Sequence, residues 1–126
     1  MYCAAQLRDF AQHSKDFEAL NTRVVAISVD GREHARQVWE KPVSRQFTVL
    51  SDPGARVIRT YGVLHPAAGD MGQDIARDTT LLVDVDGRER WRRVSQTITD
   101  HARAEEVLAR IRRLAPSTKP ATQDGR

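Results

Sequence analysis

The chain has 126 residues, of which 40% are hydrophobic and 29% are charged, and its formal net charge is +3. This length fits one domain, and the composition is that of an ordinary globular protein. No apolar run approaches the roughly 20 residues that a membrane-spanning helix needs, and we see no secretory signal, so we expect a cytoplasmic protein without a membrane partner. Basic and acidic residues alternate, which favours a mixed solvated surface and argues against nucleic acid as a partner.

The first half of the chain alternates helices and strands. Apolar side chains recur at helical spacing over residues 4–20, which predicts one amphipathic helix. Residues 23–29 are mostly apolar and rich in β-branched side chains, as expected of a buried parallel strand. Asp30 followed by Glu33 resembles a capping box, so a second helix should start there and stop before Pro42.

The middle of the chain is predicted to hold a second strand and a short helix. Residues 47–50 have the composition of a short strand. The string Ser51-Asp52-Pro53-Gly54 offers an N-cap with proline at the first helical position, so a helix should follow and end at Gly62. We expect residues 64–76 to form a long loop.

A hairpin and a helix are predicted for the last third. The dipeptide Asp86-Gly87 lies between two strand-like segments, residues 79–85 and 88–95, which is the sequence pattern of an antiparallel hairpin. Asp100 is predicted to cap the helix that follows, with an apolar stripe on one face.

The element order indicates an α/β protein with an antiparallel edge, which by itself names no function. We expect one domain over residues 1–115. Residues 116–126 are predicted to be a disordered tail, because they contain no apolar side chain larger than alanine to bury.

Cys3 is the only cysteine of the sequence, so we expect neither an internal disulfide nor a cysteine-based metal site. It stands just before the first predicted helix, whose amino terminus favours a thiolate. Two interpretations stay open: a reactive thiol, or an inert thiol near a chain end. The four histidines share no metal-ligand spacing, so we interpret them as surface residues, with His101 opening the last helix, and expect no metal and no cofactor.

Four local strings resemble a known family. They are, in chain order, Cys3-Ala-Ala-Gln6-Leu7 with Phe10, Val24-Val25-Ala26-Ile27-Ser28-Val29-Asp30, Leu50-Ser51-Asp52-Pro53-Gly54 continuing to Tyr61-Gly62-Val63, and Thr79-Thr80-Leu81-Leu82-Val83-Asp84 with Asp86-Gly87. Their order and spacing resemble the peroxiredoxins, and more closely the redoxin-domain branch of the alkyl hydroperoxide reductase and thiol-specific antioxidant family. The resemblance implies a thioredoxin-like α/β fold, with a mixed sheet and helices on both faces, from which the first core strand is missing.

The same resemblance implies a thiol-dependent antioxidant oxidoreductase that reduces hydroperoxides or disulfides through Cys3. Its implied partners are an external thiol reductant, either thioredoxin-like or of low molecular weight, and a small hydroperoxide or disulfide substrate. The missing strand would leave its two neighbours with unpaired backbone groups, so we expect a marginally stable or oligomeric chain, with a homodimer as the assembled form. Tyr2, Arg77 and Asp78 are the implied substrate-site residues. The family often holds proline or arginine at the position of Asp78. This departure and the missing strand keep a second hypothesis open, a catalytically silent domain that binds partners.

Overall fold

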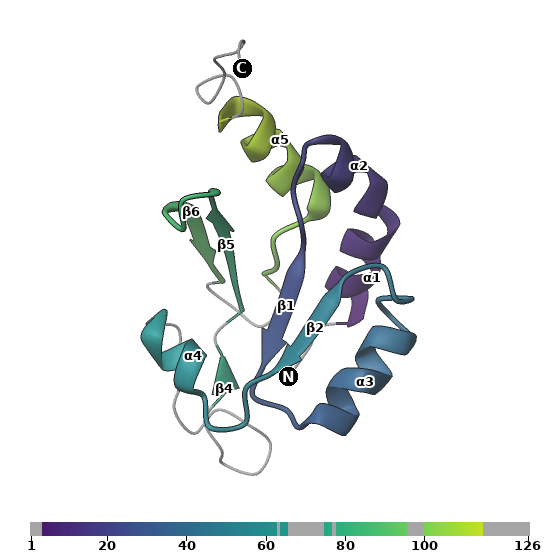
Figure 1. The fold of residues 1–126 in the computed structure, drawn as a ribbon, viewed down its shortest axis with the longest axis vertical. Helices are drawn as coiled ribbons and strands as arrows, with labels where there is room; N and C mark the ends of the chain where they lie inside the picture. Colours follow the sequence, from purple (N-terminus) through teal and green to yellow (C-terminus); the bar gives the residue numbers. More distant parts are fainter. Residues whose placement is uncertain (1–3, 63, 66–74, 77, 96–99, 115–126) are drawn as a thin grey trace.

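The computed structural model describes residues 4–62, 64–65, 75–76, 78–95 and 100–114 (Figure 1). In chain order its elements are α1 (Ala4–Gln12), α2 (Ser14–Ala19), β1 (Val25–Ser28), α3 (Arg32–Glu40), β2 (Thr48–Ser51), α4 (Arg56–Thr60), β3 (Leu64–His65), β4 (Ile75–Ala76), β5 (Thr79–Val83), β6 (Glu89–Val94) and α5 (Ala104–Leu114). The alternation of helices and strands follows the sequence prediction. The predicted disordered tail lies outside the described residues.

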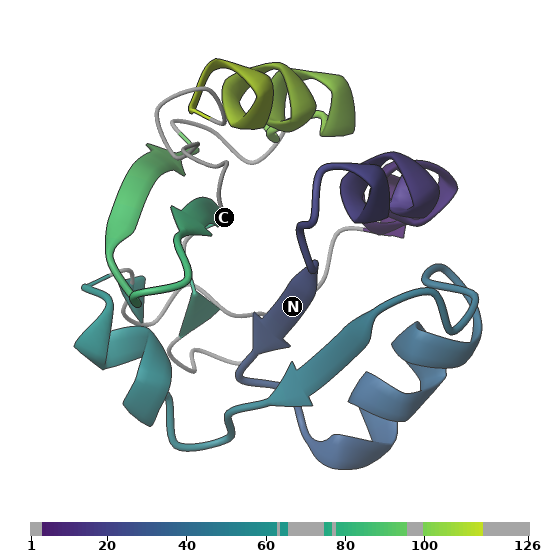
Figure 2. The same ribbon diagram turned by 45° about the horizontal axis from the view of Figure 1, so that its top comes forward.

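The strands form three two-stranded sheets. β1 and β2 are parallel, with Val25 opposite Thr48 and Ser28 opposite Ser51. β5 and β6 form the predicted antiparallel hairpin, and β3 and β4 are also antiparallel. Parallel and antiparallel pairs therefore occur together, as in a mixed α/β fold. Within the described residues the β1–β2 and β5–β6 pairs remain separate sheets (Figure 2).

One hydrophobic core nevertheless joins these two sheets. Its buried members come mainly from α1, α2, α3 and α5: Leu7, Phe10, Phe17, Val38, Val43, Phe47, Ala102, Ala104, Val107, Leu108 and Ile111. Ala26 of β1, Val49 of β2, and Leu82 and Trp91 of the hairpin pack against it. The burial of these apolar side chains holds the helices on one face of the strands.

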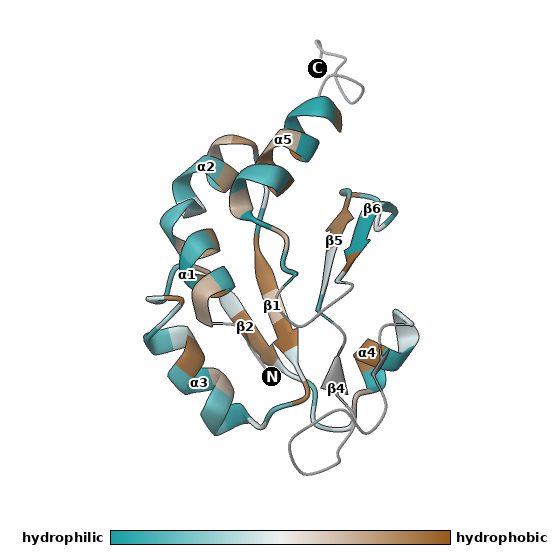
Figure 3. Cartoon of the chain, turned by 180° about the vertical axis from the view of Figure 1, so that it is seen from behind, coloured by the Kyte–Doolittle hydropathy of each residue, from teal (hydrophilic) through white to brown (hydrophobic). Residues whose placement is uncertain are grey.

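The opposite face of β1 is covered less. Val25 and Ile27 alternate with the core residue Ala26 and are 45% and 37% exposed. Further along the same face, Val29 packs against Ala55 and Ile58 at the short helix α4. Helices therefore lie on both faces, but most of them on one. Figure 3 shows how hydrophobic residues concentrate on β1 and β2.

The prediction of a single helix over residues 4–20 is wrong, because this segment forms two helices, α1 and α2, that meet at His13. The Nδ1 atom of His13 hydrogen-bonds to the carbonyl oxygen of Asp9, at 2.9 Å. That oxygen is the acceptor an α-helix would offer to the His13 amide, which instead donates to Phe10 at 3.2 Å. The side chain thus competes with the backbone ladder, and α2 begins anew at Ser14.

The capping box predicted at α3 is also wrong. Gly31 occupies the N-cap position and makes no side-chain cap. Asp30 turns back toward its own strand and accepts a hydrogen bond from the hydroxyl of Ser28, at 2.9 Å. The helix does end at Glu40, before Pro42, as predicted.

The start of α4 differs from the prediction in position. Pro53 is not its first residue, because Ala55 adopts a left-handed backbone with φ of 57° and the helix begins at Arg56. The carboxylate of Asp52 still caps the helix, accepting from the amides of Arg56 and Ile58, each at 3.1 Å. Gly62 has φ of 73° and ends the helix as predicted.

The ends of the predicted loop over residues 64–76 are ordered into the short β3–β4 ladder, and its centre lies outside the described residues. At the hairpin tip, the amide of Gly87 donates to the carbonyl of Asp84 at 3.0 Å, and Gly87 has φ of 82°. The turn therefore uses the predicted glycine for its left-handed position but spans more residues than a two-residue hairpin loop.

Candidate functional site

The amino end of α1 is where the sequence places its candidate thiol. Cys3 directly precedes Ala4, the first residue of α1. Cys3, Tyr2 and Arg77 lie outside the described residues, so their predicted roles stay predictions. The helix itself is anchored by Leu7 and Phe10, both buried.

The segment that leads into α5 runs beside this first half of α1. Gln6 donates from its amide nitrogen to the carbonyl of Ala102 at 3.0 Å, and the Asp9 carboxylate accepts from the amide of Ala104 at 2.8 Å. Ala102 and Ala104 are 2% and 0% exposed, so their small side chains permit close packing against the core. The chain from 102 to 104 therefore follows α1 in the same direction as Gln6 to Asp9 (Figures 1 and 2).

This contact corrects the predicted start of α5. Asp100 does not cap the helix, which begins at Ala104. The acceptor at its amino end is Asp9, a residue of a different helix. The carboxylate of Asp100 instead accepts from Arg93 at 2.7 Å, and this bond raises the pKa of the Arg93 guanidinium. Arg93 also contacts Glu106 at 3.0 Å, so β6 holds both the lead-in and the first turn of α5.

Asp78, one of the predicted substrate-site residues, pairs with a histidine. Its Oδ2 atom lies 2.5 Å from Nδ1 of His101. The backbone carbonyl of Asp78 accepts from the amide of Ser95 at 2.8 Å, and the Ser95 hydroxyl donates to the carbonyl of Asp100. These bonds fix Asp78 and His101 relative to each other at the start of β5.

His101 is therefore the residue that the sequence interpretation missed. It was predicted to be a surface histidine opening a helix, but it lies before α5 and is 27% exposed. It is one residue from Ala102, to which the first turn of α1 is bonded. A spacing rule cannot find this arrangement, since Asp78 and His101 are separated by 23 residues.

The described residues contain no group of three or more histidine, cysteine, aspartate or glutamate side chains able to hold a metal ion. None of the helices in the described part of the chain is long and apolar enough to cross a membrane.

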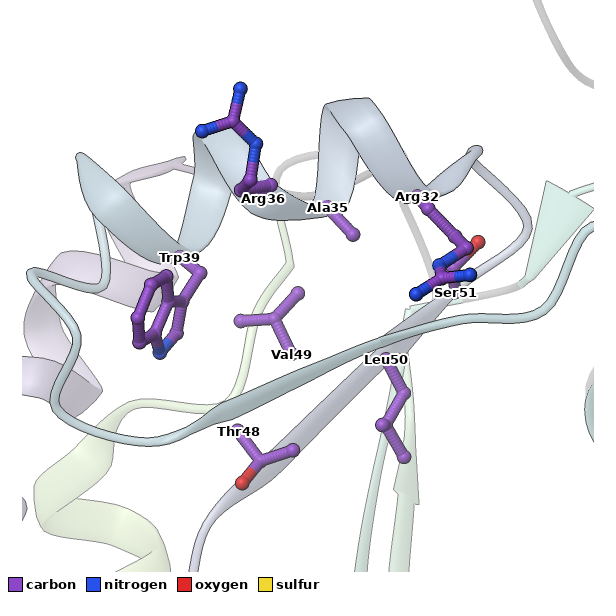
Figure 4. Close-up of a pocket in the computed structure, with 8 residues that line it drawn as sticks. All are labelled: Arg32, Ala35, Arg36, Trp39, Thr48, Val49, Leu50 and Ser51. Carbon is purple, nitrogen blue, oxygen red and sulfur yellow. The ribbon is translucent and has the colours of Figure 1, made fainter.

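A shallow hollow of about 500 Å³ lies between α3 and β2 (Figure 4). Val49 points into it toward α3, while Leu50 points away. Its charged groups are Arg32 and Arg36, and Arg36 is held by Glu33 at 2.8 Å. The described residues that line the hollow include no thiol, imidazole or carboxylate.

The overall architecture matches proteins of the thioredoxin-fold class. The chain superposes on the crystal structure of Enterococcus faecalis AhpC with a TM-score of 0.77 and 20% identity, over 96% of this chain and 72% of that chain. It also matches the peroxidoxin BcpB of Mycobacterium tuberculosis, with a TM-score of 0.73 and 24% identity, over 90% and 73% of the two chains. At such identities the likeness establishes the thioredoxin-like fold.

Sequence comparison defines the family. The AhpC/TSA family model matches residues 1–92, and the chain belongs to this family. A peroxiredoxin of Ignicoccus hospitalis is 30% identical over 93 residues, which cover 70% of this chain and 38% of the relative. Alkyl hydroperoxide reductase C of Buchnera aphidicola is 26% identical over 89 residues, 65% of this chain and 42% of the relative. The chain thus spans about two fifths of the length of these curated relatives.

Proposed function

We propose that the chain is a thiol-dependent antioxidant oxidoreductase that reduces hydroperoxides or disulfides through Cys3. The observation that carries the proposal is the coincidence of family membership with the position of the thiol. The family match includes residue 3, and the sole cysteine of the sequence directly precedes the first residue of α1.

The chemistry follows from the helix. A cysteine thiol with a pKa of about 8.5 is mostly protonated at neutral pH, and the thiolate is the nucleophile. The first turn of an α-helix offers unpaired amides and a partial positive charge, which favour the anion. In the proposed reaction the sulfur bonds to one peroxide oxygen and the O–O bond breaks. Cys3 becomes a sulfenic acid, and the other oxygen leaves as an alcohol or water after taking a proton.

An external thiol then completes the cycle, because the sequence supplies no second cysteine. The external thiol condenses with the sulfenic acid, releasing water and leaving a mixed disulfide. A second thiol displaces Cys3 and restores it. We propose a thioredoxin-like protein or a low-molecular-weight thiol in this role, in the cytoplasm, and a homodimer as the assembled form. Tyr2, Arg77 and Asp78 are proposed to line the substrate site.

Intact mass spectrometry tests the proposal. Incubating the protein with a hydroperoxide is expected to add one oxygen atom, and adding a thiol is expected to remove it. The Cys3→Ser variant should gain no such oxygen, because the sulfur is gone. An unchanged mass of the wild-type protein under excess hydroperoxide would overturn the proposal.

A further inference from the structure

One edge of β2 is unpaired within the described residues. β2 pairs in parallel with β1, and no other described strand is hydrogen-bonded to it. The amide of Asp52 donates to the carbonyl of Ser28 on β1 at 2.7 Å. Because backbone groups alternate in direction along a strand, the amide of Leu50 also faces β1, whereas Val49 and Ser51 face outward. The outward amides and carbonyls of Val49 and Ser51 have no partner among the described residues.

A groove lies beside this edge. Figure 2 shows β2 on the side of β1 that is remote from the β5–β6 hairpin, with α3 beside it. The hollow of about 500 Å³ is lined by Arg32, Ala35, Arg36 and Trp39 of α3 and by residues 48–51 of β2 (Figure 4). We name this hollow and the outward edge of β2 the β2 groove. An extended peptide matches it, because every second residue of a strand presents an amide and a carbonyl at a spacing of about 6.6 Å.

One end of the β2 groove is positively charged. Arg32 is exposed and makes no ion pair among the described residues. In Figure 4 the side chain of Arg32 extends toward β2, and that of Arg36 points away from it. Arg36 is paired with Glu33 and Glu40, at 2.8 and 3.4 Å. Since α3 starts at Gly31 without a side-chain cap, its first amides add to the positive potential, and an acidic group complements this end.

The other end of the β2 groove is apolar. Trp39 and Val49 both line the hollow while they pack against the hydrophobic core. Trp39 follows Arg32 by seven residues, which is about 10 Å along a helix axis. Side chains on one face of an extended peptide recur at every second residue. An apolar and an acidic side chain that are two or four residues apart can therefore reach the two ends of the groove together.

We propose that the β2 groove binds an extended acidic peptide of a partner protein as an added strand. Backbone hydrogen bonds to Val49 and Ser51 give affinity, while Arg32 and Trp39 select an acidic and an apolar side chain. A second copy of this chain is a poorer occupant, because its own β2 groove brings another Arg32 to a site that already carries one. The interaction involves no atom of Cys3, so it is independent of the proposed redox activity.

Fluorescence anisotropy with labelled heptapeptides tests the proposal. Threonine alternates in each probe with the residues of one face, which include one leucine and one glutamate, two or four residues apart and in either order. At least one probe is expected to bind. Replacing its glutamate with lysine is expected to weaken binding about tenfold, because the lysine faces Arg32. Failure of every probe to bind would overturn the proposal.

A pair of charge variants tests the contact with Arg32. Arg32→Glu should weaken binding of the glutamate probe about tenfold and strengthen binding of the lysine probe. A glutamate in the first turn of α3 is favourable to the helix, so the variant should fold. Arg103→Glu is the matched control, since Arg103 is also exposed but lies before α5, and both variants have the same net charge. An equal loss of binding in the two variants would overturn the proposal.

Hydrogen exchange measured by NMR shows where the peptide binds. The amides of Val49 and Ser51 should exchange rapidly in the free protein and slowly in the complex, whereas that of Leu50 should be protected in both. Protection that appears instead at Val25 and Ile27 of β1 would overturn the proposal. Protection of Val49 and Ser51 that rises with protein concentration, without peptide, would assign the groove to a second copy and also overturn it.

Discussion

At the scale of single residues, Asp9 connects two helices that are far apart in the sequence. Its carboxylate accepts from the first amide of α5, and its backbone carbonyl receives the ring of His13 at the end of α1. One residue thus terminates the regular hydrogen bonding of its own helix and caps another. The contact also holds the lead-in to α5 against α1, so it supports the position of His101.

Replacing Asp9 should therefore destabilise the whole fold. Asp9→Ala removes the cap of α5 and is expected to lower the free energy of unfolding by about 1 kcal/mol, a typical cost for a lost N-cap. Asp9→Asn keeps an oxygen acceptor and should cost less. Urea denaturation followed by circular dichroism measures both, and equal stability of Asp9→Ala and the wild type would contradict the capping role.

At the scale of elements, local sequence rules identified most of the helices and strands, but they missed the short β3–β4 ladder and several helix ends. The apolar period of α1 and α2 continues through His13, so periodicity could not show the break that a side-chain hydrogen bond introduces. The cap of α5 comes from a residue 95 positions away, so a rule based on neighbouring residues named Asp100 instead. The pairing of Asp78 with His101 was missed for the same reason, since only the folded chain brings them together.

The hairpin turn was predicted from Gly87. The carboxylate of Asp84 in the same turn makes the stability of the fold depend on pH. Asp84 accepts from the amides of Asp86 and Arg88, both at 2.9 Å. The bond from Arg88 is the largest cause that lowers the pKa of Asp84 below its ordinary value of 3.8. A lowered pKa in the folded state means that this contribution to stability is present above the unfolded pKa and is lost as pH falls through the folded pKa.

The melting temperature of Asp84→Asn should therefore fall less than that of the wild type as the pH is lowered. Glu33 and Glu89 also have lowered pKa values, through hydrogen bonds from Arg36 and Arg92, so the wild type loses stability at several groups. The difference between the two proteins isolates Asp84. Thermal melting from neutral pH to below the ordinary carboxyl pKa measures it, and parallel curves for the two proteins would contradict the assignment.

At the scale of the whole molecule, one core supports two sheets that are not hydrogen-bonded to each other within the described residues. The sequence predicted the thioredoxin-like arrangement through its resemblance to a family, and the family and fold comparisons confirm it. The outward face of the β1–β2 pair is only partly buried, with Val25 and Leu50 45% and 46% exposed. The fold as a whole places the lead-in to α5 beside α1, and the start of β5 contacts that lead-in.

The proposed use of the fold is the activation of the Cys3 thiol. The most direct measurement is the rate of Cys3 oxidation by hydrogen peroxide at neutral pH, compared with that of free cysteine under the same conditions. We expect Cys3 to react faster, because the start of a helix favours the thiolate of a cysteine that directly precedes it. A rate equal to or below that of free cysteine would contradict the account.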